Sequence, residues 1–339
     1  MRGALCDHNG LSDISVKRGG GIFTLPYNLS LLLKGWACIL IALHHYSQYM
    51  IGQGLSTNVF YFLLSTQGGY SGVALFFLLS GYGLAESEAK RHLSVKDFVI
   101  KRFWNLYKPL LLANILTYLA ILAYGLAAEP GFVPENPLAA LGLRYRDDVL
   151  WFVKILLVCY LIFTLSSQIR TKGCRNLVLT ASLLALCVAA VAGGALLRHW
   201  MSAPFFAVGV LVSEYKRETA VRIRSPWMWA ATILLLAALC AYTRMTGDAM
   251  SIHIGCNILQ TVLLLWLLSR LEIRVARNSF LGRISYPVYL VHNKILQAML
   301  FLGCWIPVLP YLAAVLLCGW LLYLLNDALK VSFRCVRTH

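Results

Sequence analysis

The residues best suited to chemistry lie in one apolar stretch of the chain, residues 31–50. Lys34 and His45 are eleven residues apart. Three helical turns at about 100° per residue would place them on one face, about 16 Å apart along the axis. His44 would point about 80° away from that face. Ionisable side chains in a membrane span are costly and mark functional sites. This spacing predicts a cation at the membrane edge and an imidazole at or beyond mid-depth.

Simpler interpretations of the same residues exist. A lysine at a helix end is typical of the cytoplasmic interface, and membrane histidines often form helix–helix hydrogen bonds. That second interpretation suits His44 better than His45. A neutral imidazole at the position of His45 would be suited to accept a proton as a general base.

Further candidate residues lie in four other segments. Residues 72–82 contain Ser80 and Gly81, where small residues allow close helix packing or a backbone donor. Residues 98–109 carry basic side chains, which indicate either a positive cytoplasmic flank or a phosphate site. Trp151 is typical of an aromatic belt. His292 is either a core histidine bonded to a nearby carbonyl or part of the site.

The composition indicates a polytopic membrane protein. Of 339 residues, 59% are hydrophobic and only 13% are charged, and the mean hydropathy is +0.70. Soluble domains are nearer 45–50% apolar and about 25% charged. The net charge of +16 lies in short loops between apolar spans, which argues against nucleic acid as a partner. Ten scattered cysteines without a CxxC pair predict no disulfide framework and no metal site. The first 20 residues lack the apolar region of a signal peptide.

We expect an all-α fold of about ten transmembrane helices with both termini in the cytoplasm. The segment 59–65 is too short to span and is expected to lie at the interface or to re-enter the membrane. The longest loop, about 128–148, is expected outside. The predicted spans are 31–50, 69–86, 104–127, 149–168, 176–197, 201–215, 226–243, 252–271, 284–304 and 307–329.

The distribution of Lys and Arg supports this topology. Twenty-two basic residues fall on the predicted cytoplasmic side and four in the odd-numbered loops, and the other four lie in or beside spans. The domain organisation that follows is a cytoplasmic tail at 1–30, a transmembrane domain at 31–329 and a cytoplasmic tail at 330–339.

Four segments together resemble the acyltransferase-3 family of integral-membrane acyltransferases. The first is a basic residue and a histidine with ten residues between them, Lys34 and His45, and Lys34 stands where the family often has arginine. The second is Gly72-Val-Ala-Leu-Phe-Phe-Leu-Leu-Ser-Gly-Tyr82. The third leads from Arg102 to Pro109, with Asn105 where a second basic residue is usual. The last is Ser285-Tyr-Pro-Val-Tyr-Leu-Val-His292, and a Trp-Phe pair at Trp151 is also similar.

The resemblance implies transfer of an acyl group, usually acetyl, from coenzyme A to a sugar hydroxyl of a surface polysaccharide or glycolipid. It implies His45 and Lys34 as catalytic residues and Arg102, Lys101 and Lys108 as donor-binding residues. Ser80, Gly81, Trp151 and His292 are the expected further lining of the site. Acetyl-coenzyme A is the donor substrate, with no bound cofactor, and the location is a bacterial cytoplasmic (inner) membrane. The alternative function is a transporter or flippase for a lipid-linked or anionic glycan, with Lys34 and His45 as counter-charge and proton relay. A purely structural membrane partner is the third alternative.

Overall fold

The computed structural model describes residues 14–18, 23–90, 95–128, 151–247, 249–275 and 279–336. The predicted outer loop at 128–148 lies almost wholly outside the described residues. The elements in chain order are β1 (Ile14–Arg18), α1 (Tyr27–Gly52), α2 (Val59–Leu63), η1 (Leu64–Gly68), α3 (Gly69–Lys90), α4 (Val95–Ala128), α5 (Trp151–Ser166), α6 (Lys172–Ala192), α7 (Leu197–Trp200), α8 (Pro204–Glu214), α9 (Lys216–Arg224), α10 (Pro226–Thr246), α11 (Met250–Arg270), β2 (Leu271–Val275), α12 (Phe280–Phe301) and α13 (Val308–Val336).

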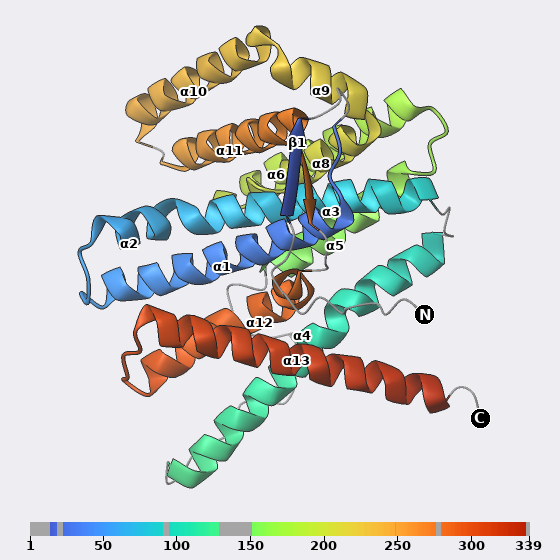
Figure 1. Ribbon diagram of the computed structural model, residues 1–339. Helices are drawn as coiled ribbons and strands as arrows, with labels where there is room; N and C mark the ends of the chain where they lie inside the picture. The colour runs from blue at the N-terminus through green and yellow to red at the C-terminus, as the bar shows by residue number, and fades with distance from the viewer. Residues whose placement is uncertain are drawn as a thin grey trace, which may run out of the picture.

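The bundle is built around α1. Helix α3 runs antiparallel beside α1 after the turn at the left of Figure 1, and α12 packs on α1 as well. Helix α8 packs on α3, and α13 packs on α12 and crosses α4. Long apolar helices of this kind satisfy all their backbone groups internally, which the hydrocarbon layer requires.

Glycines set how closely the central helices approach. A Cβ on Gly72 would lie 2.6 Å from Ile41 Cγ1 of α1. A Cβ on Gly81 would lie 2.0 Å from the carbonyl oxygen of Phe206, and one on Gly209 equally close to the carbonyl oxygen of Leu78. Helices α3 and α8 therefore touch backbone to backbone, as small-residue interfaces in membranes do.

Residues 59–65 were predicted to lie at the interface or to re-enter the membrane, and in the structure they join the second span directly through α2. Residues 59–90 form one continuous helical run of 32 residues, in which η1 is a π-helical segment. The sequence suggested a break because the apolar run stops at Ser65-Thr-Gln-Gly. The π segment carries the helix through these polar residues, and their side chains bond to helix carbonyls, as Thr66 Oγ1 does to Phe62.

Seven helical runs are long and apolar enough to span a membrane by length and composition among the described residues. They are α1, the 59–90 run, residues 100–125 of α4, α6, α10, α11 and residues 308–329 of α13. The other three predicted spans correspond to α5, α8 and α12. Helix α5 has 16 residues and α8 has 11, so both are shorter than the roughly 20 residues that a full crossing needs. Helix α12 is long enough but carries several polar side chains.

The predicted all-α class omits one feature, a two-stranded antiparallel sheet. Strand β1, from the expected N-terminal tail, pairs with β2, which follows α11, with Ile14 opposite Val275 and Arg18 opposite Leu271. The Asn28 side chain also donates to the Val275 carbonyl at 3.0 Å. The start of the chain is thereby bound to the loop between α11 and α12. Both segments were predicted to be cytoplasmic.

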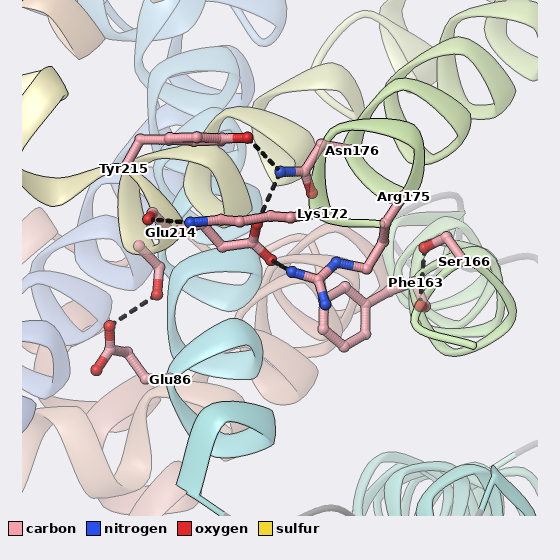
Figure 2. Close-up of polar contacts among 9 residues, drawn as sticks. Glu86, Phe163, Ser166, Lys172, Arg175, Asn176, Glu214 and Tyr215 are labelled. Carbon is pink, nitrogen blue, oxygen red and sulfur yellow. Dashed lines mark hydrogen bonds and ion pairs between the residues drawn. The ribbon is translucent and has the colours of Figure 1, made fainter. Parts of the chain in front are cut away.

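A second set of contacts joins other loops that were predicted to be cytoplasmic. Figure 2 shows the side chains of Arg175 and Asn176 converging on the Glu214 carboxylate, at 2.6 and 2.7 Å. Lys172 donates to the Glu214 carbonyl at 2.7 Å. These contacts hold the start of α6 against the end of α8. Glu86 of α3 joins the same end of the bundle by accepting from Ser213 at 2.7 Å.

Candidate functional site

A cavity of about 350 Å³ opens among α1, α3, α5, α7 and α12. Its size suits a small ligand or part of a larger one. The lining is mostly aromatic, imidazole and amide side chains with one guanidinium. The polar lining residues are His44, His45, Gln48, Tyr70, Arg198, His199, Ser202, Tyr289, Asn293 and Gln297. No Asp, Glu or Lys belongs to this lining among the residues that the structure describes.

His45, the residue predicted as base, lies in this cavity. Its Nδ1 is 3.1 Å from Gln48 Oε1, one helical turn further along α1. The Gln48 amide nitrogen donates in turn to the Ser65 carbonyl at 3.4 Å. With the Gln48 oxygen turned toward His45 by that contact, the pair is satisfied by the tautomer that carries its proton on Nδ1. The lone pair of the neutral imidazole then lies on Nε2, as a general base requires.

The π-helical segment supplies the carbonyls that orient both histidines. Ser65 holds Gln48, and the Leu64 carbonyl is 2.8 Å from His44 Nδ1. A π turn bonds i to i+5 and displaces carbonyls from the regular α-helical ladder, and such segments are frequent at functional sites. His44 is also pressed against Gly69, where a Cβ would lie 2.4 Å from its Cδ2. The buried His44 thus has the structural role that the sequence favoured for it, although it also lines the cavity.

His292 has the hydrogen bond that the core interpretation predicted, and it does not line the cavity although its ring lies beside His45. Its Nδ1 lies 2.5 Å from the Tyr289 carbonyl, which is the bond expected of a core histidine. Its ring centroid is also 5.2 Å from that of His45. The side chain is 1% exposed, and its Nε2 has no hydrogen-bond partner within the described chain. The buried ring of His292 therefore packs beside the His45 ring from α12.

Trp151 lines the outer part of the cavity and stacks on His199, with ring centroids 4.7 Å apart and planes at 15°. The short helix α7 brings His199 and Arg198 to the cavity, and Ser202 follows at its end. These three residues were missed by the sequence analysis. They lie in a loop and a weak span, where no periodicity indicates which side chains point inward.

Lys34 belongs to a separate polar cluster about three turns from His45. It is half-buried and lies within electrostatic range of Arg102 of α4. Arg102 and Ser80 both lie within electrostatic range of the Tyr160 hydroxyl of α5. The structure thus brings together Lys34, Arg102 and Ser80, three of the predicted site residues, although they come from three helices.

Four aromatic rings lie between this cluster and the cavity. Phe76 and Phe77 occupy the part of α3 between Val73, which lines the cavity, and Ser80. Phe152 contacts both rings, at centroid distances of 5.8 and 5.1 Å, and Tyr289 at 5.2 Å. These rings separate the two polar regions in the structure.

The remaining predicted residues lie elsewhere. Gly81 is in the contact with α8, and its amide belongs to the helical ladder, which leaves Ser80 as the polar group at this level. Lys101 and Lys108 are exposed on α4, and the Lys108 ammonium lies 5.6 Å from the Trp104 ring centroid. Neither lysine lines the cavity. Within the described residues, no three His, Cys, Asp or Glu side chains are grouped as a metal site would need.

Membrane-length helices around an open, histidine-lined cavity define an integral-membrane protein with a polar site. The sequence model of the acyltransferase-3 family, described as an acyltransferase domain, matches residues 31–324. The chain therefore belongs to this family and is a multi-pass membrane acyltransferase. No curated protein and no solved structure gives a match. Family membership favours the enzyme over the transporter that the sequence left open.

Proposed function

We propose that this acyltransferase moves an acetyl group from acetyl-coenzyme A to a hydroxyl of a cell-surface glycan or glycolipid, with His45 as general base. The observation that carries the proposal is the Gln48 contact. This contact is satisfied by an Nδ1–H on His45, which supports a basic lone pair on Nε2 of an imidazole that lines the cavity.

The reaction is a direct transfer. His45 Nε2 takes the proton of the acceptor hydroxyl as its oxygen attacks the thioester carbonyl. The carbon–sulfur bond breaks, the ester forms, and the proton passes from the imidazolium to the departing thiolate. The products are the O-acetyl ester and free coenzyme A, so no acyl-enzyme is needed.

The donor's phosphates are assigned to the cluster of Lys34 and Arg102. Lys34 and Arg102 lie within electrostatic range of one another, so a phosphate bound near both would be attracted by two positive charges. Lys101 and Lys108 add positive charge on the exposed surface of α4 and attract the same anion from solution.

The spacing of Lys34 and His45 suits a long donor. They are separated by about 16 Å along α1. In coenzyme A a flexible pantetheine arm joins the phosphates to the thioester, so the phosphates can stay at the inner cluster while the thioester reaches His45. The arm must pass the rings of Phe76, Phe77 and Phe152, which therefore have to move apart when the donor binds. The acceptor would then enter from the opposite face of a bacterial cytoplasmic membrane.

The test is acetyl transfer in membranes that contain the native acceptor. Radiolabelled acetyl-coenzyme A is supplied to membranes with wild type, His45→Ala or no protein. Label is expected in a glycan or glycolipid with the wild type only, and thermal unfolding of purified His45→Ala checks that the variant is folded. Label with both proteins would remove His45 as base. The proposed reaction would be contradicted if, with several acyl donors tried, membranes with the wild type incorporated no more label than membranes without the protein.

A further inference from the structure

The cavity that His45 lines carries a positively charged side chain, Arg198. Arg198 is its only ionised side chain among the described lining residues, since an arginine keeps its charge at all physiological pH values. The ion pairs in the described part of the chain join Arg175 to Glu214, Lys216 to Glu86 and Arg274 to Glu272, and none includes Arg198. The charge of Arg198 is therefore available to a ligand on this side of the cavity.

A buried hydroxyl lies in the same wall. Ser202 is 1% exposed and lines the cavity, yet its Oγ has no hydrogen-bond partner within the described chain. A buried polar group without a partner costs about 1–3 kcal/mol. An oxygen of a bound molecule would satisfy it. The unpartnered Ser202 hydroxyl therefore indicates, independently of Arg198, that a polar ligand binds in this cavity.

The neighbouring groups indicate a ligand rich in hydroxyls. Tyr289, Asn293 and Gln297 follow one another at four-residue intervals, so they line one stripe of α12 and bring two amides to the cavity. Tyr70 lies within electrostatic range of Arg198. Trp151 presents a broad aromatic surface beside them. Amides and hydroxyls around one guanidinium are suited to a sugar that carries an anionic group.

The anion is not a phosphate of the donor. The cluster of Lys34 and Arg102 lies about 16 Å from His45 along α1, beyond the ring of Phe152, whereas Arg198 lines the same cavity as His45. The two cationic regions therefore lie at different levels of the bundle, one in the cavity with His45 and one about three turns of α1 away. The one beside His45 must serve the other substrate.

We propose that the acceptor is acidic, and that Arg198 and Ser202 bind its carboxylate or phosphate while His45 activates a neighbouring hydroxyl. This inference rests on the proposed function, because it names the class of acceptor for that reaction. A neutral glycan could satisfy the Ser202 hydroxyl but would offer the Arg198 guanidinium no opposite charge, so it would bind more weakly.

The first experiment measures the charge of the product. Membranes with the native acceptor receive labelled acetyl-coenzyme A, and the labelled product is extracted and passed over an anion-exchange column. Retention is expected. Carbodiimide amidation should abolish retention if the anion is a carboxylate, and hydrogen fluoride should abolish it if the anion is a phosphate. A labelled product that is neutral would overturn the inference while the proposed function stands. Absence of label would overturn both.

The second experiment tests Arg198 itself with defined probes. Octyl glucuronide, octyl phosphate and octyl glucoside are added as competitors of label transfer in wild-type membranes. At least one of the two anionic probes should inhibit label transfer at a concentration about tenfold or more below that of the neutral glucoside. This difference is the size expected for a charge-assisted hydrogen bond. Arg198→Gln should remove that difference and raise the KM for acceptor, with the KM for acetyl-coenzyme A unchanged. Arg198→Lys should retain part of the difference between the anionic and neutral probes.

Arg244 provides a matched control. It is exposed at the end of α10, was also predicted to lie outside, and does not line the cavity. Arg244→Gln removes the same charge and should leave the competition series unchanged. Equal competition by the three probes on the wild type, or an equal effect of Arg198→Gln and Arg244→Gln, would overturn the proposed role of Arg198.

Discussion

The contact between Gln48 and His45 predicts that the rate of acetyl transfer depends on whether the side chain at position 48 accepts or donates a hydrogen bond. Gln48→Leu removes the oxygen that accepts from His45 Nδ1. Gln48→Glu keeps an acceptor at that position, and Gln48→Lys replaces it with a donor. Gln48 is exposed, so the substitutions should leave the fold intact.

The expected sizes differ because the three side chains act differently on the imidazole tautomer. Loss of one hydrogen bond costs about 0.5–1.5 kcal/mol, which corresponds to a rate about 2- to 13-fold lower for Gln48→Leu. A lysine donor favours the tautomer with the lone pair on Nδ1. It should therefore lower the rate much further, toward the 10²- to 10⁴-fold effect of losing a general base. Gln48→Glu should retain most activity.

The assay is the initial rate of labelled acetyl transfer in membranes, normalised to the amount of protein. The thermal unfolding of each purified variant is measured beside it. Gln53→Leu is the matched control, because Gln53 follows the same helix, is equally exposed and does not line the cavity. Its rate should equal that of the wild type.

The order of the rates shows whether Gln48 controls the tautomer of His45. The structure requires wild type and Gln48→Glu to be fastest, Gln48→Leu to be intermediate and Gln48→Lys to be slowest. If Gln48→Leu and Gln48→Lys both retained the wild-type rate, the tautomer of His45 would not depend on Gln48. If Gln48→Glu lost as much as Gln48→Lys, a change of charge rather than hydrogen-bond polarity would control the rate.

Three further predictions concern the fold and the donor site. Gly81→Ala would place a Cβ 2.0 Å from a backbone carbonyl of α8 and should cost about 3 kcal/mol or more, seen as loss of folded protein on size-exclusion chromatography. Gly83→Ala meets nothing within 4 Å and should be tolerated, and a similar loss in both would refute the packing argument. Glu214→Gln weakens contacts to α6 and should lower the free energy of unfolding by about 2 kcal/mol, so an unchanged unfolding temperature would contradict it. Arg102→Gln should raise the KM for acetyl-coenzyme A about tenfold, while the exposed Arg170→Gln control should not, and equal values would exclude Arg102 from the donor site.

Some features of the site were predictable because they depend on short stretches of chain. The eleven-residue spacing places Lys34 and His45 on one face of α1, since helical geometry is local. The structure indeed has both residues on one helix, with His45 in the cavity and Lys34 beside Arg102. The apolar composition and four motifs predicted a membrane bundle of the acyltransferase-3 family, and the family match confirms the family.

Other features were not predicted because they depend on how segments join. The stretch 59–65 is part of a continuous helix, since a π turn carries the helix past polar residues. Strand β1 finds its partner in β2, more than 250 residues away in the chain. No local pattern in either strand reports that partner.

The sequence by itself determined the environment of the protein, its family and the helix face that carries Lys34 and His45, because hydropathy, motifs and helical period are properties of neighbouring residues. Only the tertiary structure decided which side chains meet that face. Gln48 takes its role from a carbonyl displaced by a π turn, and Arg198 and Ser202 reach the cavity because α7 and the start of α8 fold against Trp151. Such contacts depend on the close approach of helices at glycine surfaces, which is a property of the packed bundle and not of any single segment.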